Sequence, residues 1–547
     1  MPTRDPIADL RAAVAEAANA LRDGAGDGAA PVLERPPKAE LGDYSTNAAM
    51  LLAPVLGGAP REIAERLADR LGAGLGDSLD RVEVAGPGFL NLFLSDAWYR
   101  RAASALAAAG DEIGRPAPPA TAERILVEFV SANPTGPLTA ASGRHAAYGD
   151  SVARVLAYAG AEAEREYYLN DVGGQVERFA ASIAARMTGA DPPEDGYEGE
   201  YVGEVAERLA AEGIDAGYAD ELARRGAELM RQAAEATLRR FGVTFDRWSS
   251  ERELHERGAV KRALADIERS GHLYESEGAT WLRTSELGDD KDRVLLRSGG
   301  EPTYYLSDIA YHRDKLERGA DRLLDVLGAD HHGYVGRLKA GLAAVGFDPD
   351  RLEIAIMQLV HVVEGGERAQ MSKRKGEFVT LDELIDDIGA DAARFFMLQR
   401  SHDTAVDLDL ELARRQSNEN PVYYVQYAHA RIASIFHKAG NDAVESALAA
   451  ADDSPPTPLD PSERALIRRL LELPSEVSEA AVRRAPHRLC TYAMAVAADF
   501  HGFYRDCQVI GAEGAGVEAE RIRTCVLTKR TIARTLDLLG ISAPERM

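Results

Sequence analysis

A short loop rich in glycine and proline is the part of the sequence best suited to binding a phosphate group. It joins an apolar strand expected at 125–130 to a helix expected at about 144–159, and it reads NPTGPL at 133–138. In an open α/β sheet, ligands bind where such strands end, and the first turn of a helix offers free N–H groups to phosphate. A turn without a ligand has a similar composition, so the loop alone leaves both interpretations open.

The overall composition limits the kinds of protein that this chain can be. The chain has 547 residues, 45% of them hydrophobic and 28% charged, which is too long for one core, so about two to four domains are expected. Its three cysteines exclude a disulfide framework and have no zinc-site spacing. Since the sequence shows no apolar run of membrane-spanning length and no signal peptide, we expect a cytoplasmic protein without membrane contact.

The charge is unevenly distributed. A net charge of −25 argues against binding nucleic acid regardless of its sequence, because such binding needs excess positive charge. Residues 411–547 are nearly neutral, however, with 17 Lys and Arg against 18 Asp and Glu. A specific RNA partner is therefore compatible with the composition.

The elements that must position the loop fall into three parts. Residues 1–118 have the pattern of a small α+β domain that ends in the proline-rich linker 114–120. Strand and helix patterns alternate over 119–410, as in a parallel sheet, with an acidic helical insertion at about 188–245. Long helical patterns over 411–547 predict an all-α bundle. The predicted fold class is α/β, with further sheet strands at 164–169, 323–327 and 354–363.

Seven segments, in the same order along the chain, resemble those of the class I arginyl-tRNA synthetases. The resemblance implies a Rossmann-like catalytic domain at 119–410, an N-terminal additional domain that binds tRNA at 1–118, and a helical anticodon-binding domain at 411–547. The segments are GDYSTN at 42–47, GPGFLN at 86–91, EFVSANPTGPL at 128–138, YLNDVGGQ at 168–175, GADHHGY at 328–334, MSKR at 371–374 and SNENPVYYVQYA at 417–428.

The resemblance assigns four residues to the amino-acid substrate. A guanidinium group needs carboxylates that accept its forked N–H groups. The positions that match the family's guanidinium site are Glu128, Tyr304 and Asp308, and Asn133 matches a residue that holds the amino-acid backbone. For a single Asp such as Asp308, a solvated helix position is the alternative.

The resemblance also implies an ATP site. Magnesium would arrive with ATP, held by phosphates and water and not by a protein cage. The matching positions are Ala132, Pro134, Gly136, Ala141, Gly328, Asp330, His331, Met371 and Ser372.

Two departures from the family pattern concern the catalytic residues. Thr139-Ala140-Ala141-Ser142 stands where the family has His-x-Gly-His, so hydroxyl groups replace two imidazoles at the phosphates. Gln370 replaces the first Lys of the family's Lys-Met-Ser-Lys loop, whereas Lys373 is kept. We therefore predict Thr139, Ser142 and Lys373 as catalytic residues. His145 is either a compensating cation or a solvated helix residue.

In the C-terminal part, Tyr424 and Tyr427 are candidates to stack on unpaired tRNA bases, although half or more of such aromatic residues are usually core residues. The resemblance implies an arginine–tRNA ligase, acting as a monomer, whose partners are ATP, L-arginine and tRNA(Arg). Two alternatives stay open from the sequence. One is a catalytically impaired paralogue that binds tRNA or arginine as a regulator. The other is an enzyme that activates arginine for a small acceptor.

Overall fold

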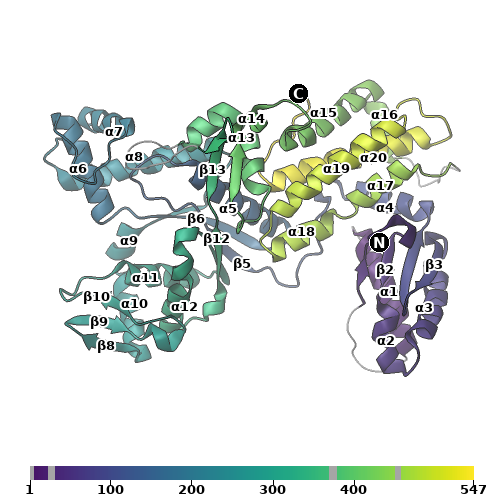
Figure 1. The fold of residues 1–547 in the computed structure, drawn as a ribbon, viewed down its shortest axis with the longest axis horizontal. Coiled ribbons are helices and arrows are strands. Elements are labelled where there is room, and N and C mark those ends of the chain that lie inside the picture. Colours follow the sequence, from purple (N-terminus) through teal and green to yellow (C-terminus); the bar gives the residue numbers. More distant parts are fainter. Residues whose placement is uncertain (1–4, 23–30, 369–378, 450–456) are drawn as a thin grey trace.

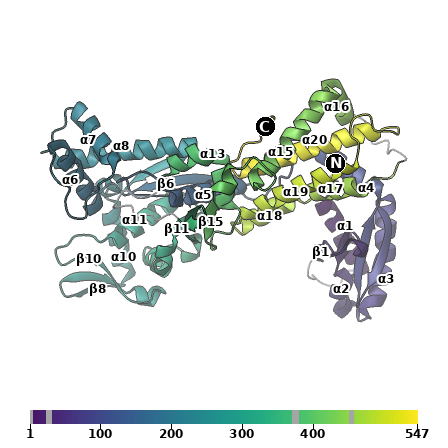
Figure 2. The same ribbon diagram turned by 45° about the horizontal axis from the view of Figure 1, so that its top comes forward.

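The computed structural model describes residues 5–22, 31–368, 379–449 and 457–547. Figures 1 and 2 show that the elements before about residue 110 lie at one end of an elongated molecule and the helices of 174–240 at the other end. The C-terminal helices lie between the N-terminal elements and the central sheet (Figure 1).

The N-terminal elements form a four-stranded antiparallel sheet in the order β1-β2-β4-β3, covered by helices. Leucines 90, 92 and 94 of one strand face the helices and are fully buried, because alternate side chains of a strand point to the same face. The bounds are α1 Pro6–Arg22, β1 Leu33–Glu34, β2 Tyr44–Thr46, α2 Ala48–Leu56, α3 Pro60–Leu75, β3 Leu79–Ala85, β4 Phe89–Leu94 and α4 Asp96–Ala108.

The central sheet has five parallel strands in the order β12-β11-β5-β6-β7, which confirms the predicted α/β class with a Rossmann-like sheet. The strands are β5 Arg124–Glu128, β6 Glu162–Leu169, β7 Arg247–Ser250, β11 Arg322–Gly328 and β12 Leu352–Met357. The helices that follow β5, β6, β7 and β11 include α5 Ala140–Tyr158, α6 Gly174–Thr188, α9 Glu251–Glu256, α10 Ala259–Ser270, α11 Tyr304–Glu317 and α12 Val335–Ala344.

Two helix layers cover opposite faces of this sheet. Val127 of β5 belongs to the same core as the buried residues of α5, whereas Leu126 packs with residues of α11 and α12. Glu128 lies two residues after Leu126, so its side chain points to the α11 face. This alternation places a carboxylate between the sheet and α11.

Smaller elements complete the part of the chain between 174 and 414. Helices α7 Glu200–Ala211 and α8 Ala219–Arg240 occupy the segment expected to be a helical insertion. An antiparallel sheet in the order β10-β9-β8 was not predicted; its strands are β8 Leu273–Ser276, β9 Ala279–Leu282 and β10 Arg293–Leu296. The remaining elements are β13 Val360–Glu364, β14 Glu367–Arg368, α13 Leu381–Leu398, β15 Val406–Asp409 and α14 Leu410–Arg414.

The prediction of one strand at 354–363 is wrong. The segment contains two strands, β12 in the central sheet and β13 in the sheet β14-β13-β15. The buried guanidinium of Arg144 accounts for the break between them, because it donates hydrogen bonds to the carbonyls of Gln358, at 2.8 Å, and Leu359, at 3.4 Å.

The described residues after 414 form helices and no strand. Their bounds are α15 Pro421–Ala439, α16 Asn441–Ala449, α17 Pro461–Leu470, α18 Leu473–Val482, α19 His487–Asp506 and α20 Val517–Leu538. Buried Arg394 of α13 binds this part to the sheet layer, since it donates to Leu539 O at 2.9 Å and to the carboxylate of Asp150 at 2.6 Å. None of the helices in the described ranges is both long enough and apolar enough to cross a bilayer.

Candidate active site

The backbone after β5 is strained. Val130 and Ser131 have φ angles of 70° and 38°, in the left-handed region that non-glycine residues rarely adopt. The Ser131 hydroxyl donates to Glu128 Oε1 at 2.8 Å and accepts the Tyr168 N–H at 3.1 Å. Such strain persists where surrounding bonds determine the conformation, and it clusters at functional sites.

A cavity of about 450 Å³ opens at the carboxyl ends of β5 and β11. It brings together seven residues that the sequence assigned to arginine or ATP, although they are up to 203 positions apart: Glu128, Ala132, Asn133, Asp308, Gly328, Asp330 and His331. The cavity is also lined by Val130, Ser131, His145, Tyr168, Tyr311, His312, Asp325, Val326, Leu327, Tyr334 and Leu338.

Among the described carboxylates that line this cavity, Asp308 is the one whose pKa is raised. Burial raises its pKa to about 6, opposed by a hydrogen bond that the Tyr334 hydroxyl donates to Oδ2. Behind it, burial and then the proximity of Asp308 raise the pKa of Glu251 to about 7. A cationic ligand would favour the ionised form of Asp308, so the site is suited to a positive charge.

Glu128 and Asn133 are held by neighbouring side chains. Glu128 is 7% exposed and accepts hydrogen bonds from Ser131 and from buried Lys315. The Asn133 amide donates to Gln175 Oε1 at 2.7 Å, which joins the loop to the first turn of α6. These hydrogen bonds therefore restrict the orientation of both side chains at the cavity.

The altered motif lies at the start of α5 and outside the cavity lining. Thr139 is the N-cap of that helix: its hydroxyl oxygen accepts the Ser142 N–H at 3.4 Å, and the two hydroxyl oxygens are also 3.4 Å apart. Ala141 is exposed, Pro134 is buried, and a side chain at Gly136 would lie 3.2 Å from the Tyr201 hydroxyl. The structure does not bring these five residues into the cavity.

The two basic residues after the motif are not free cations. Arg144 is 1% exposed and donates to four backbone carbonyls, and burial lowers its pKa to about 10. His145 lines the cavity, but burial, followed by the charge of Arg144, lowers its pKa to about 4. Neither earlier interpretation of His145 holds, because it is neither a solvated helix residue nor a cation near neutral pH.

Tyr304 departs from its expected place. It begins α11, is 56% exposed, and is not among the residues that line the cavity. Its hydroxyl lies toward the turn before α6, since a side chain at Gly173 would approach it to 3.1 Å. The predicted residues Met371, Ser372 and Lys373 lie outside the described residues.

Several residues at this site were not predicted from the sequence: the lining residues Ser131, Tyr168, His312 and Tyr334, and Lys315, which binds Glu128 from below. A compositional signal was available for one of them. The chain has 9 Lys against 55 Arg, and that scarcity marks Lys315 as much as it marks Lys373.

The two candidate tRNA-binding tyrosines have different surroundings. Tyr424 packs against His501, with ring centroids 4.9 Å apart. The Tyr427 ring is parallel to that of Tyr423 at 6.1 Å, and the Arg431 guanidinium lies 5.4 Å from its centroid. Both rings are partly exposed and both contact His501, but the Tyr427 ring also has a cation beside it, which suits base stacking.

Comparison with known families defines the class. Residues 8–94 match the arginyl-tRNA synthetase N-terminal domain, residues 209–433 the catalytic domain of class I (R) tRNA synthetases, and residues 425–547 the DALR anticodon-binding domain. With the parallel sheet and the cavity at its carboxyl edge, these matches define a class I aminoacyl-tRNA synthetase.

Individual relatives narrow the class to a family. A Frankia alni protein named arginine–tRNA ligase is 45% identical, with 99% of this chain and 100% of that protein covered. A Campylobacter jejuni structure described as a putative arginyl-tRNA synthetase is 32% identical, with a TM-score of 0.76 over 83% of this chain and 100% of that one. The Thermus thermophilus arginyl-tRNA synthetase structure is 26% identical, with a TM-score of 0.75 over 98% and 99%. The chain belongs to the arginyl-tRNA synthetase family.

Proposed function

We propose that the cavity beside Glu128 and Asp308 binds L-arginine for an arginine–tRNA ligase reaction. The protein uses ATP to activate arginine and transfers the arginyl group to the 3′ end of tRNA(Arg), giving AMP and pyrophosphate. An impaired paralogue is not favoured, because relatives that are 43% to 46% identical over at least 94% of this chain are named as the ligase.

The observation that carries the arginine assignment is the pair of carboxylates in one cavity. Asp308 has a raised pKa, and among the described residues no ion pair satisfies its carboxylate. A guanidinium would supply the missing cation and two or more N–H donors. Asn133, at the cavity edge, would then meet the amino-acid backbone.

For the chemical steps we propose positioning and electrostatic stabilisation without a covalent enzyme intermediate. The arginine carboxylate attacks the α-phosphorus of ATP and pyrophosphate leaves. The terminal 2′-hydroxyl of tRNA then attacks the arginyl carbonyl and AMP leaves. Thr139, Ser142 and, on sequence grounds, Lys373 are proposed to contact the phosphates, with Gly328, Asp330 and His331 bordering the nucleotide.

The remaining assignments are also proposals. Magnesium would enter with ATP, and no group of three or more His, Cys, Asp or Glu side chains in the described ranges is arranged to hold a metal ion. We propose tRNA contacts through 1–118 and 411–547, with Tyr427 stacking on a base. We also propose that the protein acts as a monomer in the cytoplasm.

The test is Asp308→Asn, assayed by aminoacylation of purified tRNA(Arg). We expect the KM for arginine to rise by about 30-fold or more, equivalent to about 2 kcal/mol or more, with little change in the KM for ATP. The control is Asp314→Asn on the same helix, which pairs with Arg257 and Arg318 away from the cavity. An unchanged arginine KM in Asp308→Asn would remove the cavity from arginine binding.

A further inference from the structure

Three carboxylates lie in one row across the central sheet. Glu166 of β6 is the register partner of Glu128, and Glu128 is the register partner of Asp325 of β11. They are 0%, 7% and 2% exposed, respectively. Neighbouring strands are about 4.8 Å apart, so a buried row of like charges requires cations beside it.

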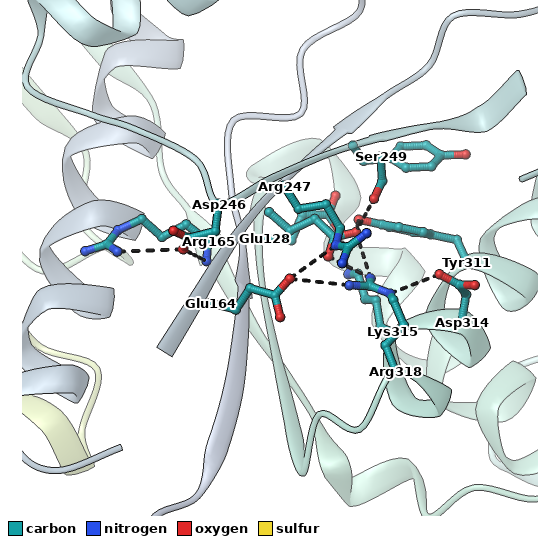
Figure 3. A network of polar contacts seen from close by, with 12 residues as sticks. Glu128, Glu164, Arg165, Asp246, Arg247, Ser249, Tyr311, Asp314, Lys315 and Arg318 are labelled. Atoms are coloured by element: carbon teal, nitrogen blue, oxygen red, sulfur yellow. Dashed lines mark hydrogen bonds and ion pairs between the residues drawn. The ribbon is translucent and has the colours of Figure 1, made fainter. Parts of the chain in front are cut away.

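Helix α11 supplies these cations. The Lys315 ammonium is fully buried and donates to Glu128 Oε2 and, at 2.9 Å, to Asp325 Oδ1. Three residues later, Arg318 binds both oxygens of Glu166 at 2.7 and 2.9 Å. Figure 3 shows Lys315 and Arg318 reaching from one helix toward carboxylates of the sheet.

The carboxylates paired with Lys315 and the carboxylate paired with Arg318 differ in their relation to the cavity. Glu128 and Asp325 line it, whereas Glu166 does not. Lys315 is not a lining residue either, so it acts from beneath the surface that a ligand would touch. Asp325 also accepts a hydrogen bond from His312 Nε2 at 2.6 Å, and His312 Nδ1 lies 2.7 Å from the Asp308 carbonyl oxygen.

These contacts determine which groups of the cluster are ionised. Burial alone would lower the pKa of Lys315, but Asp325 and Glu128 raise it above its usual value. Burial would raise the pKa of Asp325, but Lys315 and His312 lower it overall. Lys315 is thus a permanent cation that keeps Asp325 ionised.

We propose that Lys315 is a positioning residue for arginine, because its ammonium compensates Glu128 and Asp325 from below and leaves Asp308 as the carboxylate that a substrate cation must satisfy. This inference rests on the proposed arginine site. Glu128 then presents its remaining lone pairs to the guanidinium in a fixed orientation. Lys315 sets both the charge and the shape of the pocket floor without touching the substrate.

The test of this role is the pH dependence of arginine binding after Lys315→Met. The charged and titratable groups around Lys315 and the adjoining cavity come from several elements: Glu128 on β5, Tyr168 and Glu166 on β6, Glu251 on α9, Asp308, Tyr311, His312 and Arg318 on α11, Asp325 on β11, and Tyr334 after β11. Without the ammonium, the carboxylates that line the cavity lose their counter-ion, and a proton replaces it. Arginine must then displace that proton.

We expect Lys315→Met to raise the arginine KM by about tenfold or more at pH 6.5, with a smaller effect at pH 8.5. The ATP KM should change by less than about twofold. Calorimetric titration with arginine in two buffers of different ionisation enthalpy should show proton release that is larger than in the wild type.

The matched control is Arg318→Met, which breaks a partly buried ion pair on the same helix outside the cavity. It should lower the stability while leaving the arginine KM within about twofold at both pH values. A Lys315→Met defect that is absent, or equally large at both pH values, would overturn the proposal and leave Lys315 a structural residue.

A second variant keeps the test decisive if Lys315→Met fails to fold. Lys315→Met combined with Asp325→Asn removes one charge of each sign, so it should fold and lose the pH-dependent part of the defect. A pH-dependent defect that persists in the double variant contradicts the proposal. The Asp308→Asn variant distinguishes failure of the Lys315 proposal from failure of the proposed arginine site. An unchanged arginine KM in that variant would refute the arginine site itself.

Discussion

The phenol of Tyr334 donates a hydrogen bond to Oδ2 of Asp308, and this contact joins the first turns of α11 to the segment that follows β11. The bond stabilises the ionised carboxylate, whereas burial disfavours it, and burial is the larger effect. Asp308 consequently titrates at about pH 6 in the free protein. If Asp308 binds arginine as proposed, this pKa predicts that arginine binding depends on pH.

The arginine affinity should therefore fall in acid. A carboxyl group with a raised pKa is protonated below that pKa, while the substrate guanidinium stays charged, so each pH unit below about 6 should cost up to about tenfold in kcat/KM for arginine. Tyr334→Phe removes the stabilising donor and should move the transition to higher pH. The measurement is kcat/KM for arginine between pH 5 and 8, and superimposable profiles for the two proteins would contradict the assignment.

Thr139→Ala should lower the free energy of unfolding through loss of a helix cap, in addition to any loss of the proposed contact with phosphate. The hydroxyl of Thr139 caps α5, and loss of such a cap costs about 1 kcal/mol. Urea unfolding should show this loss, and Thr139→Ser, which keeps the hydroxyl, should recover most of it. Equal unfolding free energies for Thr139→Ala and the wild type would show that the 3.4 Å contact does not stabilise the helix.

Tyr427→Ala should weaken tRNA binding. Stacking of one base on an aromatic ring contributes about 1–3 kcal/mol, so the KM for tRNA should rise by about 5-fold to 150-fold while the arginine KM stays constant. Tyr218→Ala is a suitable control, because Tyr218 is 62% exposed and precedes α8 at the far end of the molecule (Figure 1). A tRNA KM that changes equally in the two variants would exclude a specific role for Tyr427.

Arg394→Met should have a large effect on stability. Arg394 and Asp150 are both fully buried, and removal of one partner of such a pair costs about 3–5 kcal/mol. Arg154→Met removes a second cation from the same carboxylate, but that side chain is 30% exposed and should matter less. The test is urea unfolding of both variants. Similar losses in the free energy of unfolding would show that burial does not determine how much each ion pair contributes to stability.

The substrate site stays a prediction, but the residues predicted for it lie together in the structure where a motif and its local element coincide. Glu128 and Asn133 flank a strand end, and their spacing places both at the cavity. Tyr304 shows the limit of such an argument. It shares a helical face with Asp308 four residues later, but at the first position of the helix it is 56% exposed, with its hydroxyl toward Gly173 and outside the cavity lining.

By itself, the sequence determined the fold class from local periodicity and the family from the order of its motifs, and the same motifs predicted the carboxylates proposed for a guanidinium. Only the tertiary structure decided how those carboxylates are compensated. Lys315 lies 187 positions from Glu128 and 10 from Asp325, and the three side chains meet because β5 and β11 are neighbours in the sheet and α11 packs on that face. Strand order arises from packing between distant segments, so no local pattern can encode it. The same packing buries Arg144, whose guanidinium donates to backbone carbonyl groups. It also buries His145, whose lowered pKa keeps the imidazole neutral. Neither residue is therefore a free cation for the altered motif.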